Sequence, residues 1–327
     1  MNMPMITANG CDFYYEQQGQ GPDLVFIHGE IHGMEYWDQQ LAEFSRDHRC
    51  LVYNRRGHAR TKWTDYGFSL HNQTRDLEQL IGRLDIERPV FIALAFGTTI
   101  AANYAIRNPD KVRGIVLGAW SELHDAFQYF ERWEQYSLRA AHVLEREGRA
   151  AFINLLREQG GKTIYKVIPV DSPVREKVIQ MFGSHPLGEY QRGMLEFGLS
   201  VPDLIPEFKK LDIPVLGICG ANDPYPDQPE VLRGMAHFRE AAQIAGAGRF
   251  RELGKAYGVQ RRHPSFSAIV AMNWTSSAAS NQGEIDRWSS RQRAGRSRSR
   301  RGVNRRCRGT MCVAGSRRSS NTVNWRE

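Results

Sequence analysis

The sequence has few cysteines and no long apolar run. Its five cysteines show neither the spacing of a disulfide framework nor that of a metal site: Cys11, Cys50, Cys219, Cys307 and Cys312. An odd number of cysteines without a signal peptide favours a reducing cytoplasm over a secreted, disulfide-stabilised fold. No apolar run approaches the ~20 residues that a membrane-spanning helix needs. We therefore predict a cytoplasmic protein that does not span a membrane.

Acidic residues are scarce in the last quarter of the chain. Residues 251–327 contain 16 arginines and one lysine against three glutamates and one aspartate, a net charge of +13. Because the whole chain carries +8, residues 1–250 carry a net charge of −5. The basic tail is also rich in serine and glycine, a composition that buries too little apolar area to fold alone.

Three explanations for this tail stay open. It is a disordered extension without a role, or it binds nucleic acid by neutralising phosphates, which we expect least. The third and favoured explanation is an out-of-frame reading of the end of the gene, because the composition changes abruptly after Phe250. We predict that residues 251–327 form an atypical basic tail, rich in arginine and serine, that is disordered or out of frame.

Apolar segments alternate with stretches of helical periodicity over residues 1–250. Five of these segments are predicted as strands: 23–29, 49–57, 90–93, 112–118 and 214–220. Strands that alternate with helices pair in parallel, and their carboxyl ends carry the functional groups. The pattern predicts an α/β fold with a doubly wound, mostly parallel sheet.

A sharp turn of small residues follows the predicted strand at 90–93. Its middle position is Ala95, between Leu94 and Phe96, and Gly97 closes it before a helical stretch. In a G-x-S-x-G turn of this kind, the middle residue is a serine that acts as the nucleophile. A methyl group cannot attack a carbonyl carbon. The turn therefore indicates the fold but lacks the nucleophile; an ordinary strand–turn–helix is the alternative.

These segments, in this order, resemble the α/β-hydrolase superfamily, in its branch of small cofactor-free esterases, lactonases and carbon–carbon bond hydrolases. The likeness covers residues 9–250. His28-Gly29 is similar to the family's oxyanion loop, and Arg56-Gly57 to the core of its D-x-R-G-x-G-x-S loop. Within that loop, Asn54 replaces the aspartate and Thr61 the serine.

The resemblance implies how the chain is divided and what it binds. Residues 1–120 and 207–250 would form the α/β-hydrolase core, and residues 121–206 an inserted helical lid. The lid begins with many aromatic residues, which favours an apolar or aromatic small molecule as substrate or ligand. The family needs no cofactor and no metal, and no membrane or nucleic-acid partner is expected.

The resemblance also assigns the catalytic positions. Ala95 takes the place of the nucleophile, Asp223 that of the acid, and Arg249 that of the histidine base. Arginine stays protonated in proteins and cannot act as a general base. The oxyanion hole would be formed by the backbone N–H groups of Glu30 and Phe96. An engineered serine-to-alanine change would explain Ala95 but not Arg249.

Other residues could supply acid or base chemistry. His28, His58 and Glu122 are candidates, because a histidine–carboxylate pair can move protons without a nucleophile. For each histidine alone a structural role is favoured, with His28 beneath the oxyanion loop and His58 in a surface loop.

Three functions stay open. The chain is a hydrolase-like protein impaired in covalent serine catalysis, which we favour. It is alternatively a non-covalent acid/base enzyme, such as a lyase, cyclase or cofactor-free dioxygenase. The third possibility is a non-catalytic binder of a ligand or partner.

Overall fold

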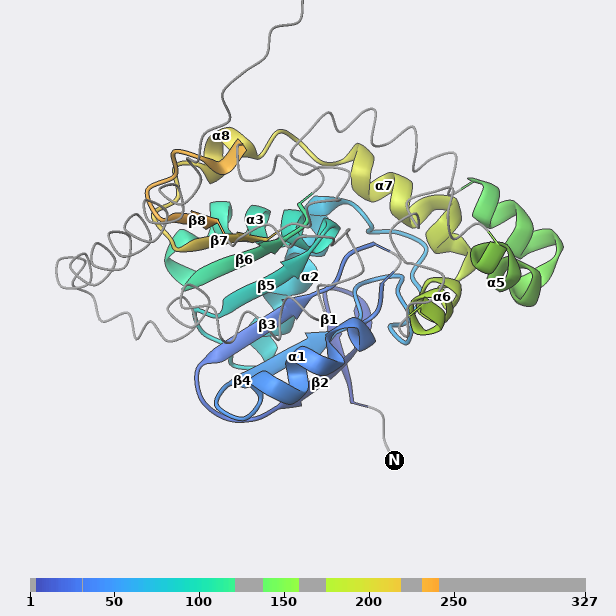
Figure 1. The fold of residues 1–327 in the computed structure, drawn as a ribbon, viewed down its shortest axis with the longest axis horizontal. Coiled ribbons are helices and arrows are strands. Elements are labelled where there is room, and N and C mark those ends of the chain that lie inside the picture. Colours follow the sequence, from blue (N-terminus) through green and yellow to red (C-terminus); the bar gives the residue numbers. More distant parts are fainter. Residues whose placement is uncertain (1–3, 31, 121–137, 159–174, 219–230, 241–327) are drawn as a thin grey trace, which may run out of the picture. The chain divides into compact units, whose positions relative to one another are not determined.

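The computed structural model describes residues 4–30, 32–120, 138–158, 175–218 and 231–240 (Figure 1). All of them belong to one compact unit, residues 1–273. The basic tail predicted at 251–327 lies outside the described residues.

Within the described residues, the strands form one eight-stranded sheet in the order β1-β2-β4-β3-β5-β6-β7-β8. The first two pairings, β1 with β2 and β2 with β4, are antiparallel, and all others are parallel. This confirms the predicted mostly parallel sheet. The strands are β1 (Met5–Ala8), β2 (Cys11–Gln18), β3 (Asp23–Ile27), β4 (Arg49–Tyr53), β5 (Val90–Leu94), β6 (Gly114–Gly118), β7 (Val215–Ile218) and β8 (Phe238–Glu240).

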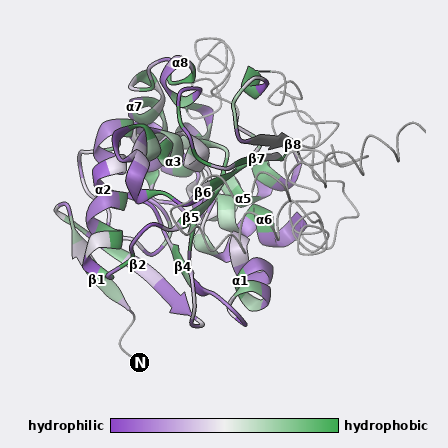
Figure 2. Ribbon diagram, turned by 90° about the vertical axis from the view of Figure 1, so that its left-hand side faces the viewer, coloured by the Kyte–Doolittle hydropathy of each residue, from purple (hydrophilic) through white to green (hydrophobic). Residues whose placement is uncertain are grey.

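The helices of the α/β core follow the periodicity of the sequence. They are α1 (Asp38–Phe44), α2 (Leu70–Arg83), α3 (Phe96–Arg107) and α8 (Ile205–Phe208), with the short 3₁₀ turns η1 (Met34–Trp37) and η2 (Pro109–Lys111). Ser69 caps α2, because its side-chain oxygen accepts the N–H of Asn72. Figure 2 shows hydrophilic and hydrophobic residues on α2, as expected of a helix with one buried face.

Two apolar clusters cover the two faces of the sheet. Along β5, Phe91 and Ala93 pack with apolar residues of α2 and α3. The alternate residues Val90, Ile92 and Leu94 pack with η1 and α1. All five are fully buried. A continuous apolar run is therefore the sequence that a central parallel strand requires, because its side chains enter a core on either face.

The described part of residues 121–206 is helical. It contains α5 (Gly148–Glu158), α6 (Arg175–Gly183), the π-helical turn η4 (Glu189–Gly193) and α7 (Met194–Leu199), coloured green to yellow in Figure 1. The aromatic start of this segment lies outside the described residues. Its role as a lid stays a prediction.

Two of the cysteines lie in the core. Cys11 and Cys50 are buried and free, as expected of small core residues, and burial raises the pKa of each thiol to about 12. Cys219, Cys307 and Cys312 lie outside the described residues. No helix in the described part of the chain is long and apolar enough to cross a membrane.

Candidate functional site

The predicted turn after β5 has the backbone of a nucleophile elbow. Ala95 adopts φ 46° and ψ −122° between β5 and α3, a conformation that residues other than glycine rarely adopt. Its N–H donates to the carbonyl of Gly118 at 2.9 Å, and its carbonyl accepts the N–H of Thr98 at 2.8 Å. The turn is thus fixed from both sides. The side chain at its apex is a methyl group.

Glycines allow the elbow to pack tightly against the end of β3. A Cβ atom added at Gly97 would overlap the carbonyl oxygen of Ile27 and lie 2.7 Å from that of His28. A Cβ added at Gly29 would lie 3.0 Å from the Cβ of Ala95. The last position of the turn therefore has to be glycine, because the first turn of α3 passes directly over the β3 backbone.

The two residues predicted to form an oxyanion hole lie at the ends of neighbouring strands. Phe96 is the first residue of α3, and Glu30 follows β3 by three residues. β3 and β5 pair in parallel, with Ile27 opposite Ala93, so both strands end at the same edge of the sheet. The carbonyl of Glu30 contacts Nδ1 of His32 at 2.6 Å.

The side chain of Glu30 is held in a buried charged cluster. Its Oε2 atom accepts from the Arg55 guanidinium at 3.3 and 3.4 Å, and its Oε1 atom lies 3.1 Å from Nε2 of His58. Burial on its own would raise the pKa of Glu30. The Arg55 charge and the contacts with Glu189 and His58 outweigh burial and hold this pKa well below its ordinary value.

His58 is buried, and the prediction that it lies in a surface loop is wrong. Its Nδ1 atom lies 2.9 Å from the carbonyl oxygen of Arg56, and Nε2 faces Glu30 and, at 3.6 Å, Oε1 of Glu189. Because a carbonyl oxygen only accepts, Nδ1 carries the proton in the neutral ring. Burial lowers the pKa of His58, against the opposing effect of Glu30.

Glu189, like Arg55, is a residue of this cluster that the sequence did not single out. It is the first residue of η4 and is buried. Burial has the largest effect on the pKa of Glu189 and the neighbouring Glu30 carboxylate the next largest, and together they raise this pKa well above its ordinary value. Glu189 is thus the protonated member of the carboxyl pair. Nothing in its local sequence indicates this, because its partners come from residues 130 or more positions earlier.

His28 has both ring nitrogens engaged with the backbone. Nδ1 donates to the carbonyl of Gly29 at 2.7 Å, and Nε2 accepts the N–H of Arg55 at 2.9 Å. Burial, with a smaller effect of His58, lowers the pKa of His28 well below its ordinary value. The ring is therefore neutral and ties the end of β3 to the loop after β4.

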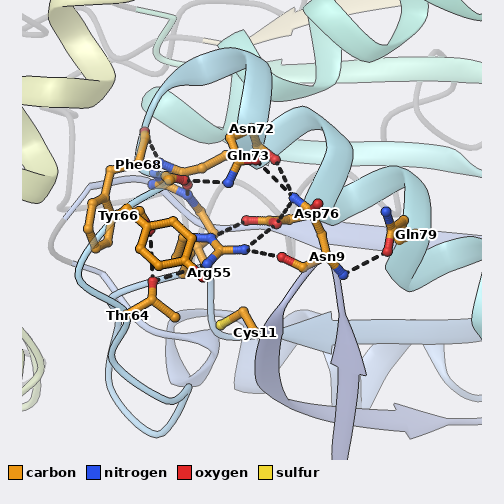
Figure 3. Close-up of polar contacts among 12 residues, drawn as sticks. Asn9, Cys11, Arg55, Thr64, Tyr66, Phe68, Asn72, Gln73, Asp76 and Gln79 are labelled. Atoms are coloured by element: carbon orange, nitrogen blue, oxygen red, sulfur yellow. Dashed lines mark hydrogen bonds and ion pairs between the residues drawn. The ribbon is translucent and has the colours of Figure 1, made fainter.

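That loop is anchored by a second ion pair, whose acceptors Asp76 and Asn9 are labelled in Figure 3. Arg56 donates to both carboxylate oxygens of Asp76 on α2, at 2.8 and 2.7 Å, and to the carbonyl of Asn9 at 2.9 Å. Asn54 accepts the N–H of Met34 at 2.9 Å. These bonds fix residues 54–61, and with them Arg55 and His58, relative to the sheet.

The structure brings together part of the predicted site. Ala95, Phe96, Glu30 and His28 gather where β3 and β5 end, and His58 joins them through Glu30. Three further positions lie outside the described residues: Glu122, Asp223 and Arg249. Their assigned roles stay predictions.

Comparisons with known proteins relate the chain to small-molecule enzymes. It is 27% identical over 126 residues to a haloalkane dehalogenase of Mesorhizobium japonicum, which covers 38% of this chain and 39% of the dehalogenase. It is 26% identical over 237 residues to 3-oxoadipate enol-lactonase 2 of Acinetobacter baylyi, covering 67% of this chain and 79% of the lactonase. The chain thus spans about two fifths of the dehalogenase.

Solved structures share the fold. A thermophilic esterase from Thermogutta terrifontis superposes with a TM-score of 0.65 at 20% identity, covering 80% of this chain and 97% of the esterase. The family model for the alpha/beta hydrolase fold matches residues 22–250, from the start of β3 past the last described strand. The chain belongs to the α/β-hydrolase family.

Proposed function

We propose that this chain binds a small organic molecule at the elbow of an α/β-hydrolase fold and does not hydrolyse it through an acyl-enzyme. One observation carries the proposal: Ala95 has the strained backbone of the nucleophile position and no side-chain oxygen. Loss of the serine from a triad lowers turnover by about 10⁶-fold, and oxyanion stabilisation alone leaves about 10³-fold over the uncatalysed rate.

The predicted base position supports the same conclusion. Arg249 stands where the family resemblance places a histidine, and a guanidinium does not accept a proton near neutral pH. Asp223, at the acid position, then has no histidine to orient. Covalent serine catalysis therefore lacks both its nucleophile and its base.

The ligand class follows from the relatives. Proteins named as a lactonase, an esterase and a dehalogenase resemble this chain, which supports a small ester-like or lactone-like molecule as the ligand. The helices of residues 121–206 would cover this molecule as a lid, and their buried aromatic and aliphatic side chains favour an apolar or aromatic one.

A second candidate function is acid/base catalysis without a nucleophile. It is favoured by the contact between Nε2 of His58 and Oε1 of Glu30, which joins a base and a carboxylate near the elbow. Glu122 would be a further acid. In this case the unaltered chain is active, and its activity is lost on His58→Ala.

A set of variants assayed with activated esters and lactones tests the first proposal. We compare the unaltered chain with Ala95→Ser, Ala95→Ser with Arg249→His, and Ala119→Ser. Ala119 is a matched control, because it is a buried alanine with φ 49° just after the neighbouring strand β6. Hydrolysis that appears only in the Ala95→Ser, Arg249→His protein supports the proposal. Ordinary enzymes turn over at about 1 s⁻¹ or faster. Esterase turnover by the unaltered chain above about 1 s⁻¹ therefore contradicts the proposal.

A further inference from the structure

Three side chains of types that can bind a metal ion face one another between the core and the helical segment of residues 175–199. We propose that Glu30, His58 and Glu189 bind one divalent transition-metal ion, with zinc the best match. The site joins the loop after β3, the loop after β4 and the turn η4. This inference does not rest on the first proposed function, because it concerns a cluster that covalent hydrolysis does not use. It competes with the second candidate function, because a metal ion on Nε2 of His58 would occupy the lone pair that acts there as the base.

The spacing of the three donor atoms suits such an ion. Nε2 of His58 lies 3.1 Å from Oε1 of Glu30 and 3.6 Å from Oε1 of Glu189, and one donor atom from each of the three residues lies within 4.8 Å of the other two. Tetrahedral zinc with bonds of about 2.0–2.1 Å places its ligands about 3.3 Å apart. The two separations from Nε2 of His58 lie on either side of that value, and the two carboxylate donors lie within 4.8 Å of each other.

The orientation of His58 is that of a metal ligand. Its Nδ1–H donates to the carbonyl of Arg56, which turns the Nε2 lone pair toward the two carboxyl groups. Histidines that bind metals commonly donate their other ring N–H to a backbone carbonyl or a carboxylate. The Arg56–Asp76 ion pair fixes this carbonyl in turn.

The donor atoms of the cluster carry lone pairs that face one another. The Nε2 lone pair of His58 faces carboxyl oxygens, which are acceptors unless protonated, and Oε2 of Glu189 is buried with no hydrogen-bond partner. A proton on Glu189 satisfies one of these contacts. A divalent cation satisfies all three donors at once, which is why we favour a metal site over a purely proton-sharing cluster.

Arg55 leaves the metal-facing oxygen of Glu30 available. Its shorter bonds, of 2.8 and 3.0 Å, go to Oε1 of Gln73, and its contacts with Glu30 involve only Oε2. Two carboxylates, one guanidinium and one divalent ion sum to a single positive charge. A net charge of this size is close to neutral for a buried site, and a hydroxide bound to the ion would lower the net charge further.

The donor set and the space around it select the class of ion. One imidazole with two carboxylates suits zinc and its neighbours in the first transition row, whereas magnesium and calcium prefer oxygen ligands alone. A Cβ atom added at Gly57 or Gly193 would overlap Oε2 of Glu189. Glycine at both positions therefore leaves room for this carboxyl group at the site. A water molecule would complete the coordination.

Metal binding to the full-length protein tests the site. After chelator treatment, we titrate with zinc, cobalt or magnesium chloride by calorimetry and record the visible spectrum of the cobalt form. We expect one equivalent of zinc, a tetrahedral cobalt spectrum, and no magnesium binding. Glu189→Gln mimics the protonated side chain and preserves the fold, and we expect it to weaken zinc binding by at least about tenfold.

The control is Glu196→Gln on α7. Glu196 is a carboxylate of the same helical segment that accepts the N–H groups of Phe68 and Ser69, outside the proposed site. Full zinc binding by this variant, with loss in Glu189→Gln and in His58→Gln, supports the proposal. Absence of zinc binding by the unaltered chain overturns it. Binding that is equal in all variants, which shows adventitious surface ions, overturns it as well.

Discussion

Nε2 of His58 lies 3.1 Å from Oε1 of Glu30, in a cluster from which solvent is excluded. Glu30 belongs to the loop that packs against the elbow, and His58 to the loop that follows β4. The contact therefore connects the place where the family has its oxyanion loop with a charged cluster that extends to η4. A carboxylate is tolerated beside the elbow because the charge of Glu30 is balanced by Arg55.

Arg55→Met should destabilise the protein strongly. The substitution leaves the Glu30 carboxylate buried without its cation, which costs about 3 kcal/mol of unfolding free energy. Combining it with Glu30→Gln removes both charges and should recover most of that loss. Urea unfolding of the two single variants and the double variant measures the coupling.

Arg60→Met serves as the control for Arg55. Arg60 lies in the same loop as Arg55 and pairs with Glu35 at 2.8 Å. Its side chain is 44% exposed, so this pair contributes at most about 1 kcal/mol to the free energy of unfolding. Equal losses in Arg55→Met and Arg60→Met would show that burial of the first pair has no energetic consequence.

Gly97→Ala should destabilise the elbow. The added methyl group overlaps the carbonyl oxygen of Ile27 and forces α3 away from β3, at a cost of about 2 kcal/mol or more. Gly82→Ala on α2 is the matched control, since a Cβ there meets no atom within 4 Å. That change should stabilise the helix by up to about 1 kcal/mol. Thermal unfolding measures both, and a neutral Gly97→Ala would contradict the close approach.

The thiols of Cys11 and Cys50 should resist alkylation in the native protein. A pKa of about 12 leaves each thiol protonated at pH 9, with a thiolate fraction of about 10⁻³, whereas an ordinary cysteine is largely ionised there. Iodoacetamide treatment at pH 9 with peptide mapping, with and without urea, checks this. Labelling of either cysteine at the same rate in both conditions would contradict its burial.

The five parallel strands β3 to β7 could be predicted from the sequence, because each is a run of consecutive apolar residues. The run Val90–Leu94 is apolar throughout, and only a strand covered on both faces requires that. The elbow was predictable for a related reason: small residues at 93, 95 and 97 allow a helix to begin directly over a neighbouring strand.

The charged cluster could not be predicted in the same way. His58 stands in a polar stretch typical of a surface loop, and it is buried because Arg56, Thr61 and Asn54 anchor that stretch to distant elements. Glu189 lies in a helical segment where a glutamate is ordinarily solvated. Its burial depends on the folding of residues 175–199 against the core, and the local sequence pattern does not predict that packing.

Covalent trapping is the most direct test of the account. The unaltered chain and the Ala95→Ser, Arg249→His protein are incubated with a fluorophosphonate, and intact mass spectrometry with peptide mapping locates any adduct. We predict no adduct on the unaltered chain and one equivalent on the peptide that contains position 95 of the variant. A stoichiometric adduct on the unaltered chain that maps to the loops after β3, β5 or β7 would contradict the account, because the site would then hold a nucleophile other than the one missing at Ala95.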